Sequence, residues 1–371
     1  MNINQMKRAL STFRNADVSI IKDDALRAKA QKLQAKQKGF TLLELLVVIT
    51  LLATLATAAL VAYDGIGENA RDASAATALT TLEGTLRNYR VIEGEYPEQF
   101  DSLANADAVT TDASGAMQIM SDETKAFFGQ LVISDTNADN TTGGTVTHAI
   151  ADSLREAGLE ELQAIVGDTS WDTGYVPNLA LNESYPLVTN GAPSGTELGF
   201  PEEDASGAIT YGDATITAAG FSSVALSIVP SEGDGTNGCI VGTGGPSLAN
   251  DFNGDATDEN TRLNLISDAL DDDQCSLVVA VGVGKDVPGA TLGKSVEIGQ
   301  VPTVGTNDVN PKDSYARAIA LFLVAQDDDE NGVIEAGEVN EKARLIGLVD
   351  PEGRTIDEIV AAATASTDDD D

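Results

Sequence analysis

The sequence holds few of the residues on which most enzymes and metal centres depend. Among its 371 residues there are one histidine, His148, and two cysteines, Cys239 and Cys275. It also lacks a Gly-x-Ser-x-Gly elbow, a phosphate-binding glycine loop and a zinc-type cluster of histidine and cysteine. His148 stands at the front of an amphipathic stretch, where we expect a capping or surface role. We therefore expect a protein that is not an enzyme.

Basic residues are also scarce. The chain has 22 Lys and Arg against 59 Asp and Glu, a formal net charge of −37, and aromatic residues make up 5%. Nucleic-acid binding depends on clustered Lys and Arg, so a nucleic-acid partner is not expected. The low aromatic content predicts a light core, and the acidic balance favours cation binding, high solubility or a salty environment.

The charges are unevenly placed along the chain. Residues 1–39 hold nine basic and three acidic residues, which leaves 13 and 56 for the remainder, a net charge near −43. Between these parts, Phe40 to Tyr63 form an apolar run with one charged residue, Glu44. As a helix this run spans about 36 Å, enough to cross a bilayer. The positive-inside rule then predicts a cytoplasmic leader and an exported remainder. A buried helix of a soluble domain is the alternative.

The stretch Lys38-Gly39-Phe40-Thr41-Leu42-Leu43-Glu44-Leu45 resembles the processing motif of type IV prepilins and type II secretion pseudopilins. The resemblance implies that a prepilin peptidase cuts between Gly39 and Phe40 and methylates the new amine of Phe40. It also implies an inner-membrane protein that the assembly machinery draws into a helical filament of its own copies. Glu44 lies one helical turn beyond the new cation, and the resemblance implies that it neutralises the Phe40 amine of a neighbouring subunit.

Beyond the apolar run, a helix is expected to continue to residue 93. Its apolar positions recur at helical spacing, and Gly94 and Pro97 end the pattern. These positions are Ala75, Leu79, Leu82, Leu86 and Tyr89. Two features depart from the pilin pattern: the apolar run has no proline, and the leader is long. The choice between a pilus subunit and a secretion pseudopilin therefore stays open.

The remainder predicts an α+β fold, in which the long N-terminal helix packs on a β-sheet. Residues 148–166 have the spacing of an amphipathic helix, whereas 208–229 and 275–284 are rich in Val and Ile and predict strands. In an oxidising compartment Cys239 and Cys275 are expected to form a disulfide worth roughly 3–4 kcal/mol. Two buried thiols are the alternative.

Residues 327–338, DDDENGVIEAGE, match the calcium-loop pattern at every required position. Gly332 supplies the sharp turn, and Ile334 fits the apolar position beside the loop. Oxygen ligands for Ca²⁺ are expected from Asp327, Asp329, Asn331, Val333 (its carbonyl), Glu335 (through water) and Glu338 (two oxygens). Residues on both sides of the loop favour helices, which predicts an EF-hand-like helix–loop–helix. A solvated acidic turn is the alternative.

A second acidic loop, at 251–260, offers Asp251, Asn253 and Asp255 at alternating spacing. It lacks the glycine after Asp255, and Arg262 stands where the bidentate acid belongs, so an Asx-rich turn is the competing interpretation.

These patterns divide the chain into six parts. They are a cleaved basic leader (1–39), a transmembrane helix (40–63), the exported half of that helix (64–93), an acidic α+β domain (94–310), the calcium helix–loop–helix (311–350), and a short helix with an acidic tail (351–371). Together they predict a calcium-stabilised pilin or pseudopilin. The rival hypothesis is a membrane-anchored calcium-binding adhesin that does not polymerise, for which the Gly39–Phe40 junction and Glu44 are unnecessary.

Overall fold

The structure is a computed structural model, and the chain divides into two units, Met1–Gly65 and Ile66–Asp371. It describes residues 5, 8, 11–12, 15–35, 42–104, 119–125, 127–134, 144–166, 177–181, 194–203, 209–211, 223–231, 239–248, 274–285, 301–306 and 308–365.

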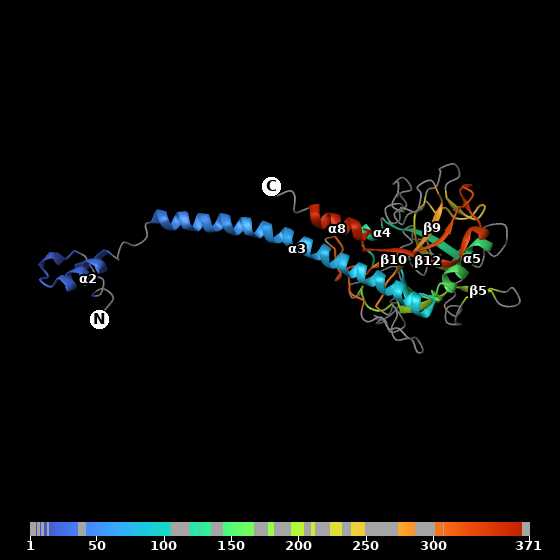
Figure 1. Ribbon diagram of the computed structural model, residues 1–371, viewed down its shortest axis with the longest axis horizontal. Helices are drawn as coiled ribbons and strands as arrows, with labels where there is room; N and C mark the ends of the chain where they lie inside the picture. Colours follow the sequence, from blue (N-terminus) through green and yellow to red (C-terminus); the bar gives the residue numbers. More distant parts are fainter. Residues whose placement is uncertain are drawn as a thin grey trace. The chain divides into compact units, whose positions relative to one another are not determined.

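Among the described residues of the first unit, a 3-10 turn and helix α2, which Figure 1 labels, precede the apolar run. A 3-10 turn, η1 (Val18–Ile20), is capped by Asp17, whose carboxylate accepts the N–H of Ser19 at 2.9 Å. Helix α2 (Asp24–Ala35) follows, and Asp23 accepts the N–H groups of the first turn, including that of Ala25 at 2.9 Å. Side-chain acceptors of this kind satisfy N–H groups that a helix start leaves unpaired.

Helix α3 (Leu42–Glu93) begins in the first unit and ends in the second. Its segment Leu42–Leu60 is long and apolar enough to cross a membrane, and none of it is buried in the structure. The threonines of this segment bond within the helix; the Thr50 hydroxyl, for example, donates to the Val47 carbonyl at 2.9 Å. The segment therefore presents no unpaired threonine hydroxyl to lipid.

Gly94 ends α3. Its φ of +87° lies in the left-handed region that glycine adopts without steric cost, and its N–H donates to the Arg90 carbonyl at 2.9 Å. The five apolar positions expected from the helical spacing, from Ala75 to Tyr89, are all buried. Pattern and structure therefore agree on this helix.

The second unit is α+β. Its strands are β1 (Phe100–Ser102), β2 (Gly129–Ser134), β3 (Glu161–Val166), β4 (Ser194–Gly199), β5 (Pro201–Glu203), β6 (Ile209–Tyr211), β7 (Ser223–Val229), β8 (Ile240–Val241), β9 (Ser276–Gly282), β10 (Ile319–Gln326), β11 (Val333–Ile334) and β12 (Val339–Val349). Its further helices are α4 (Asp122–Lys125), α5 (Gly144–Glu156), η3 (Ala336–Glu338) and α8 (Ile356–Ala365).

The main sheet has eight strands, with the path β12-β10-β9-β1-β3-β4. It forks at β9, which pairs with β10 along one edge and with both β1 and β7 along the other; β7 in turn pairs with β2. All these pairs are antiparallel except β1 with β3. Two small sheets, β11 with β8 and β5 with β6, complete the described pairings.

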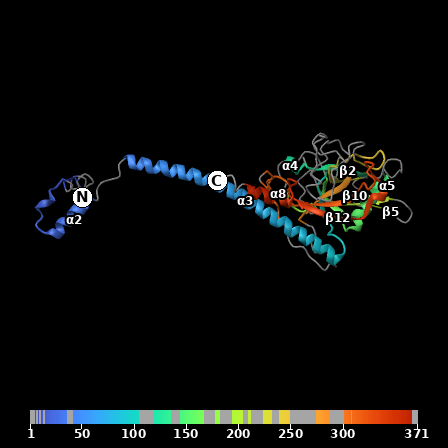
Figure 2. The same ribbon diagram turned by 45° about the horizontal axis from the view of Figure 1, so that its top comes forward.

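Both faces of the central strands are covered. On β10, Ala320, Phe322 and Val324 join the core cluster that contains the apolar faces of α3 and α5. The alternate residues Ile319, Leu321 and Leu323 join a second cluster on the opposite face. Figures 1 and 2 show α3 running past β10 and β12. A strand buried on both faces reads as a continuous apolar run.

The structure corrects the helix expected at 148–166. Helix α5 ends at Glu156, and Gly158, at φ +105°, turns the chain into strand β3. A Cβ at Gly158 would collide with the backbone of Tyr96, so only glycine fits this turn. In β3, Leu162, Gln163 and Ala164 are all buried, so the strand shows no alternation of burial that could have separated it from the helical pattern.

The structure also corrects the helices expected beside the calcium loop. The residues before it form strand β10 and those after it form strand β12, which pair with each other. The EF-hand-like helix–loop–helix is therefore wrong, and 327–338 connects two neighbouring antiparallel strands. Burial on both faces removed the alternation by which β10 could have been distinguished from a helix.

Candidate functional site

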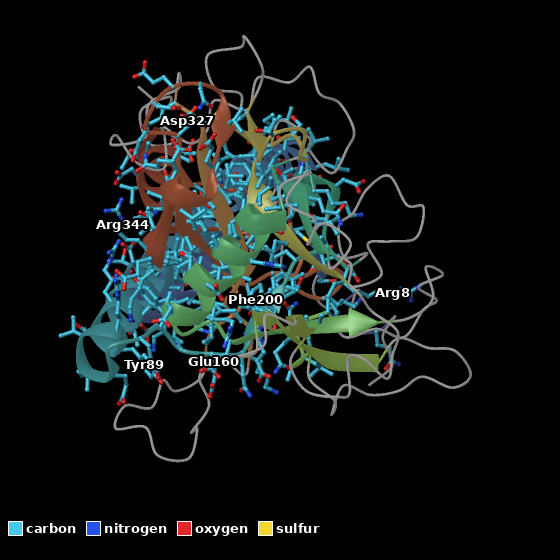
Figure 3. All side chains as sticks on the ribbon, turned by 90° about the vertical axis from the view of Figure 1, so that its right-hand side faces the viewer. Arg8, Tyr89, Glu160, Phe200, Asp327 and Arg344 are labelled. Atoms are coloured by element: carbon cyan, nitrogen blue, oxygen red, sulfur yellow. A yellow bond between two sulfur atoms is a disulfide. The ribbon has the colours of Figure 1, made fainter. Side chains whose placement is uncertain are left out.

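The loop at 327–338 keeps its acidic groups together although it lacks the flanking helices. Carboxylate oxygens of Asp327, Asp329 and Glu338 all lie within 4.8 Å of one another. Asp327 is buried, Glu338 is half-buried and Asp329 is exposed. In Figure 3 Asp327 lies far from Tyr89, at the opposite end of the second unit from the last turns of α3.

Backbone N–H groups organise these carboxylates. The N–H of Gly332 donates to Asp327 Oδ2 at 2.7 Å, and the N–H of Asn331 lies 3.3 Å from Asp327 Oδ1. Gly332 has a φ of +79°, which the sharp turn requires and glycine adopts most readily. Glu338 closes the loop, because its two oxygens accept the N–H groups of Asp328 at 3.0 Å and Glu335 at 2.8 Å.

The arrangement suits a hard divalent cation. Within the described part of the chain, no Lys or Arg forms an ion pair with Asp327, Asp329 or Glu338. Three carboxylates so close together repel one another, and a cation with oxygen ligands relieves that repulsion. The remaining expected ligands lie in the same loop: Asn331 Oδ1 accepts the N–H of Val333 at 2.7 Å, and Glu335 immediately precedes η3.

A disulfide flanks this loop. Cys239 and Cys275 are joined, with their Cα atoms 5.4 Å apart. The Cys275 carbonyl accepts the N–H of Asp327 at 2.9 Å, and the neighbouring Gln274 side chain donates to the Asp327 carbonyl at 2.9 Å. The first calcium-loop residue is therefore tied to the disulfide through the backbone.

The residues that follow the other cysteine contact the middle of the loop. Cys239 directly precedes β8, which pairs in parallel with β11 inside the loop. The N–H of Ile240 donates to the Gly332 carbonyl at 3.1 Å, and the N–H of Gly242 to the Ile334 carbonyl at 2.9 Å. The sequence does not predict these contacts between the loop and the residues at the two cysteines, because the contacting residues are more than 50 positions apart in the chain.

A second polar network joins α3 to the residues before α8. Arg354 donates to Asp350 at 2.8 Å, and its guanidinium also lies 3.1 Å from Glu352 and 3.4 Å from Asp72 of α3. Burial raises the pKa of Asp350 to about 6, although the Arg354 guanidinium opposes the shift. No local sequence pattern signalled this cluster.

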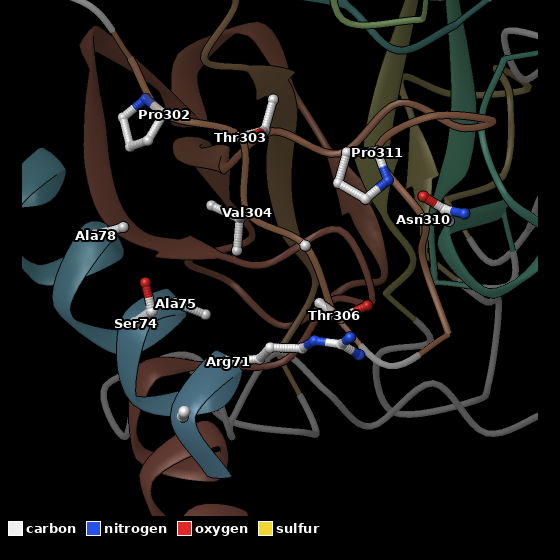
Figure 4. A pocket seen from close by; sticks show the side chains of 12 residues that line it. Arg71, Ser74, Ala75, Ala78, Pro302, Thr303, Val304, Thr306, Asn310 and Pro311 are labelled. Carbon is white, nitrogen blue, oxygen red and sulfur yellow. The ribbon is translucent and has the colours of Figure 1, made fainter. Parts of the chain in front are cut away.

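A cavity of about 620 Å³ lies between α3 and residues 302–311 (Figure 4). Small residues from Ala70 to Ala78 form one wall, and Arg71 is the one ionisable side chain among the described residues that line it. The single histidine, His148, lies half-buried within α5, away from these lining residues. The cavity therefore contains no evident acid–base pair.

Several expected site residues cannot be placed. Gly39 and Phe40, and the second acidic loop with Asp251, Asn253 and Asp255, lie outside the described residues. Glu44 is described: it lies in the first turn of α3 and is exposed.

One comparison with known proteins gives a match. Residues 34–60 match the family model of the prokaryotic N-terminal methylation motif, the prepilin motif of type IV pilins and pseudopilins. No curated protein and no solved structure matches the chain. The match confirms the resemblance based on residues 38–45, and it ends at Leu60, where the membrane-length segment of α3 also ends. The chain thus carries a prepilin-type N-terminus, which implies processing by a prepilin peptidase.

Proposed function

We propose that this protein is a structural subunit, a pilin or pseudopilin, of a type IV pilus or type II secretion filament. The observation that carries the proposal is the methylation motif at 34–60, which continues into an apolar helix with Glu44 in its first turn. Before assembly the subunit resides in the bacterial inner membrane with its acidic domain exported. After cleavage, the Phe40 amine and the Glu44 carboxylate of adjacent copies pair in lipid, where each charge alone is unfavourable.

The calcium loop supports a second part of the proposal. We propose that Ca²⁺ binds Asp327, Asp329, Asn331, Val333, Glu335 and Glu338, where Glu335 acts through water. The three converging carboxylates without a cationic partner among the described residues favour this assignment. Outside the cell, where calcium is near millimolar, even a weak site with a dissociation constant of about 10⁻⁴–10⁻³ M is substantially occupied.

Mass spectrometry of the protein from its native host tests the processing step. We expect a mature chain that begins at Phe40 and carries one additional methyl group. An intact leader on the functional protein contradicts the proposal.

The variant Glu44→Ala tests assembly. We expect it to remain in the membrane but to be lost from sheared filaments, because the pairing carboxylate is absent while the apolar span is kept. Glu68→Ala, an exposed acid beyond the span, is the matched control and should leave filaments intact. If Glu44→Ala and wild type both bind calcium and neither is found in filaments, the non-polymerising calcium-binding adhesin becomes the better account.

A further inference from the structure

The leader carries lysines whose charge is not compensated locally. Lys22, Lys29 and Lys32 are exposed, and none of them forms an ion pair with a described acidic residue. The three acids of the leader are otherwise engaged. Asp17 caps η1, Asp23 caps α2, and Asp24 pairs with Arg27 at 3.1 Å. The folded leader therefore presents net positive charge at its surface.

Two large apolar side chains in the same segment of the chain are also exposed. Ile20 in η1 is 77% exposed and Leu26 in the first turn of α2 is 57% exposed. Exposing such apolar side chains to water is unfavourable. In a membrane interface the alkyl stems of lysines can pack beside them, while the ammonium groups stay among the lipid headgroups. A segment that combines basic residues with exposed apolar residues is typical of one that lies on a bilayer surface.

The chain length keeps this surface near a membrane. Helix α2 ends at Ala35 and α3 begins at Leu42, so at most about 25 Å of extended chain separates them. When the span is inserted, α2 lies within reach of the headgroups whatever its orientation. This tether raises the effective concentration of the lysines at the surface.

We propose that the leader binds anionic phospholipid headgroups through Lys22, Lys29 and Lys32, with Ile20 and Leu26 entering the interface. Bound in this way, α2 holds the Gly39–Phe40 junction at the membrane surface in the precursor. The proposal rests on insertion of the span, and it stands independently of cleavage and polymerisation. Lipid is favoured over nucleic acid because exposed apolar residues and a membrane tether contribute nothing to phosphate-backbone binding in solution.

The test uses the full-length precursor, reconstituted into vesicles of phosphatidylcholine with and without anionic phosphatidylglycerol. A polarity-sensitive fluorophore is attached at Leu26→Cys; the native cysteines are joined to each other, so only the introduced thiol reacts. Ala28→Cys, exposed and on a different face of α2, carries the control label. We expect the Leu26 label to shift to the blue in anionic vesicles and to return toward its aqueous emission at high salt.

Two sets of variants decide whether charge is the cause. Neutralising the three residues (Lys22→Gln, Lys29→Gln and Lys32→Gln) should reduce partitioning to the surface by about a hundredfold and abolish the shift. Replacing the same three residues with arginine should keep it. The proposal is overturned if the Leu26 label emits identically in both lipids, if the glutamine variant keeps the shift, or if an oligonucleotide but not anionic lipid changes the emission. If the shift is found but the protein never forms filaments, the leader surface stands and the filament proposal fails.

Discussion

Glu338 closes the loop at 327–338, because its two carboxylate oxygens accept the N–H groups of Asp328, near the start of the loop, and Glu335, near its end. Glu338→Gln removes one charge and one of these acceptors, so we expect calcium affinity to fall by at least about tenfold. Calorimetric titration measures this change, with Glu341→Gln, an exposed acid in β12, as the control. Equal affinity in Glu338→Gln and wild type contradicts the ligand assignment.

Asp350 makes a separate prediction about pH. Its folded-state pKa of about 6 lies above the ordinary value of 3.8, because burial penalises the charged form more than Arg354 favours it. The stability contribution of this group is therefore fully present below pH 3.8 and is lost as the pH rises through about 6. The difference between the pKa of about 6 and the ordinary pKa of 3.8 corresponds to a loss of about 3 kcal/mol in the free energy of unfolding.

The substitution Asp350→Asn isolates this group from the many other acids of the chain. Between pH 4 and pH 7, the unfolding free energy of wild type should fall more steeply than that of the variant. Denaturant titrations in the presence of a chelator measure both slopes without a contribution from calcium. Parallel slopes count against a raised pKa, and Asp308→Asn, an exposed acid, should leave the slope as in wild type.

At the scale of elements, the disulfide and the calcium loop form one assembly. Cys275 holds the start of the loop through Asp327, and Cys239 leads into β8, which pairs with the middle of the loop. Reduction frees these two anchors from each other, so we expect calcium affinity to fall by roughly tenfold in the reduced protein. By linkage, calcium should favour the oxidised form, so that a smaller fraction of the bond is reduced at equilibrium with a given thiol reductant.

Calorimetry on oxidised protein and on the double variant Cys239→Ser and Cys275→Ser measures the affinity change. Thiol release under a reductant, with and without calcium, measures the reciprocal effect. Glu338→Gln is the control here, since calcium should hardly change the fraction of its disulfide that is reduced at equilibrium. Identical affinities in the oxidised protein and the double variant show that the two features are independent.

The elements also show which patterns sequence alone could resolve. Helix α3 and the processing motif are local patterns with strong periodicity, and both were recognised. For β10 and β12 the sequence predicts helices, because β10 is buried on both faces and because the calcium motif itself favours helical flanks. The spacing of the acidic residues predicts a calcium loop at 327–338, whereas the link of this loop to Cys275 and the Asp72–Arg354 contact depend on tertiary structure and have no local signal.

At the scale of the whole molecule, charge opposes assembly. Residues 40–371 carry a net charge near −43, so copies packed side by side in the proposed filament would repel one another. At an ionic strength of 0.1 M, salt screens the repulsion between charges that are more than about 10 Å apart. At low ionic strength this screening is weaker, so neighbouring domains repel one another more strongly. In the proposed calcium-bound form, the divalent cation would reduce the charge of each copy and hold together the loop between β10 and β12.

Filaments should therefore shorten or dissociate when a chelator removes calcium at fixed low ionic strength, and they should recover when calcium is returned. Raising monovalent salt should reduce the effect of the chelator if general repulsion dominates, because screening then replaces part of what the ion does. If loop order dominates, salt will not substitute for calcium, and Glu338→Gln filaments will resemble chelated wild type. Filament length by electron microscopy distinguishes these cases, and equal lengths with and without chelator at every salt concentration contradict a role for calcium in assembly.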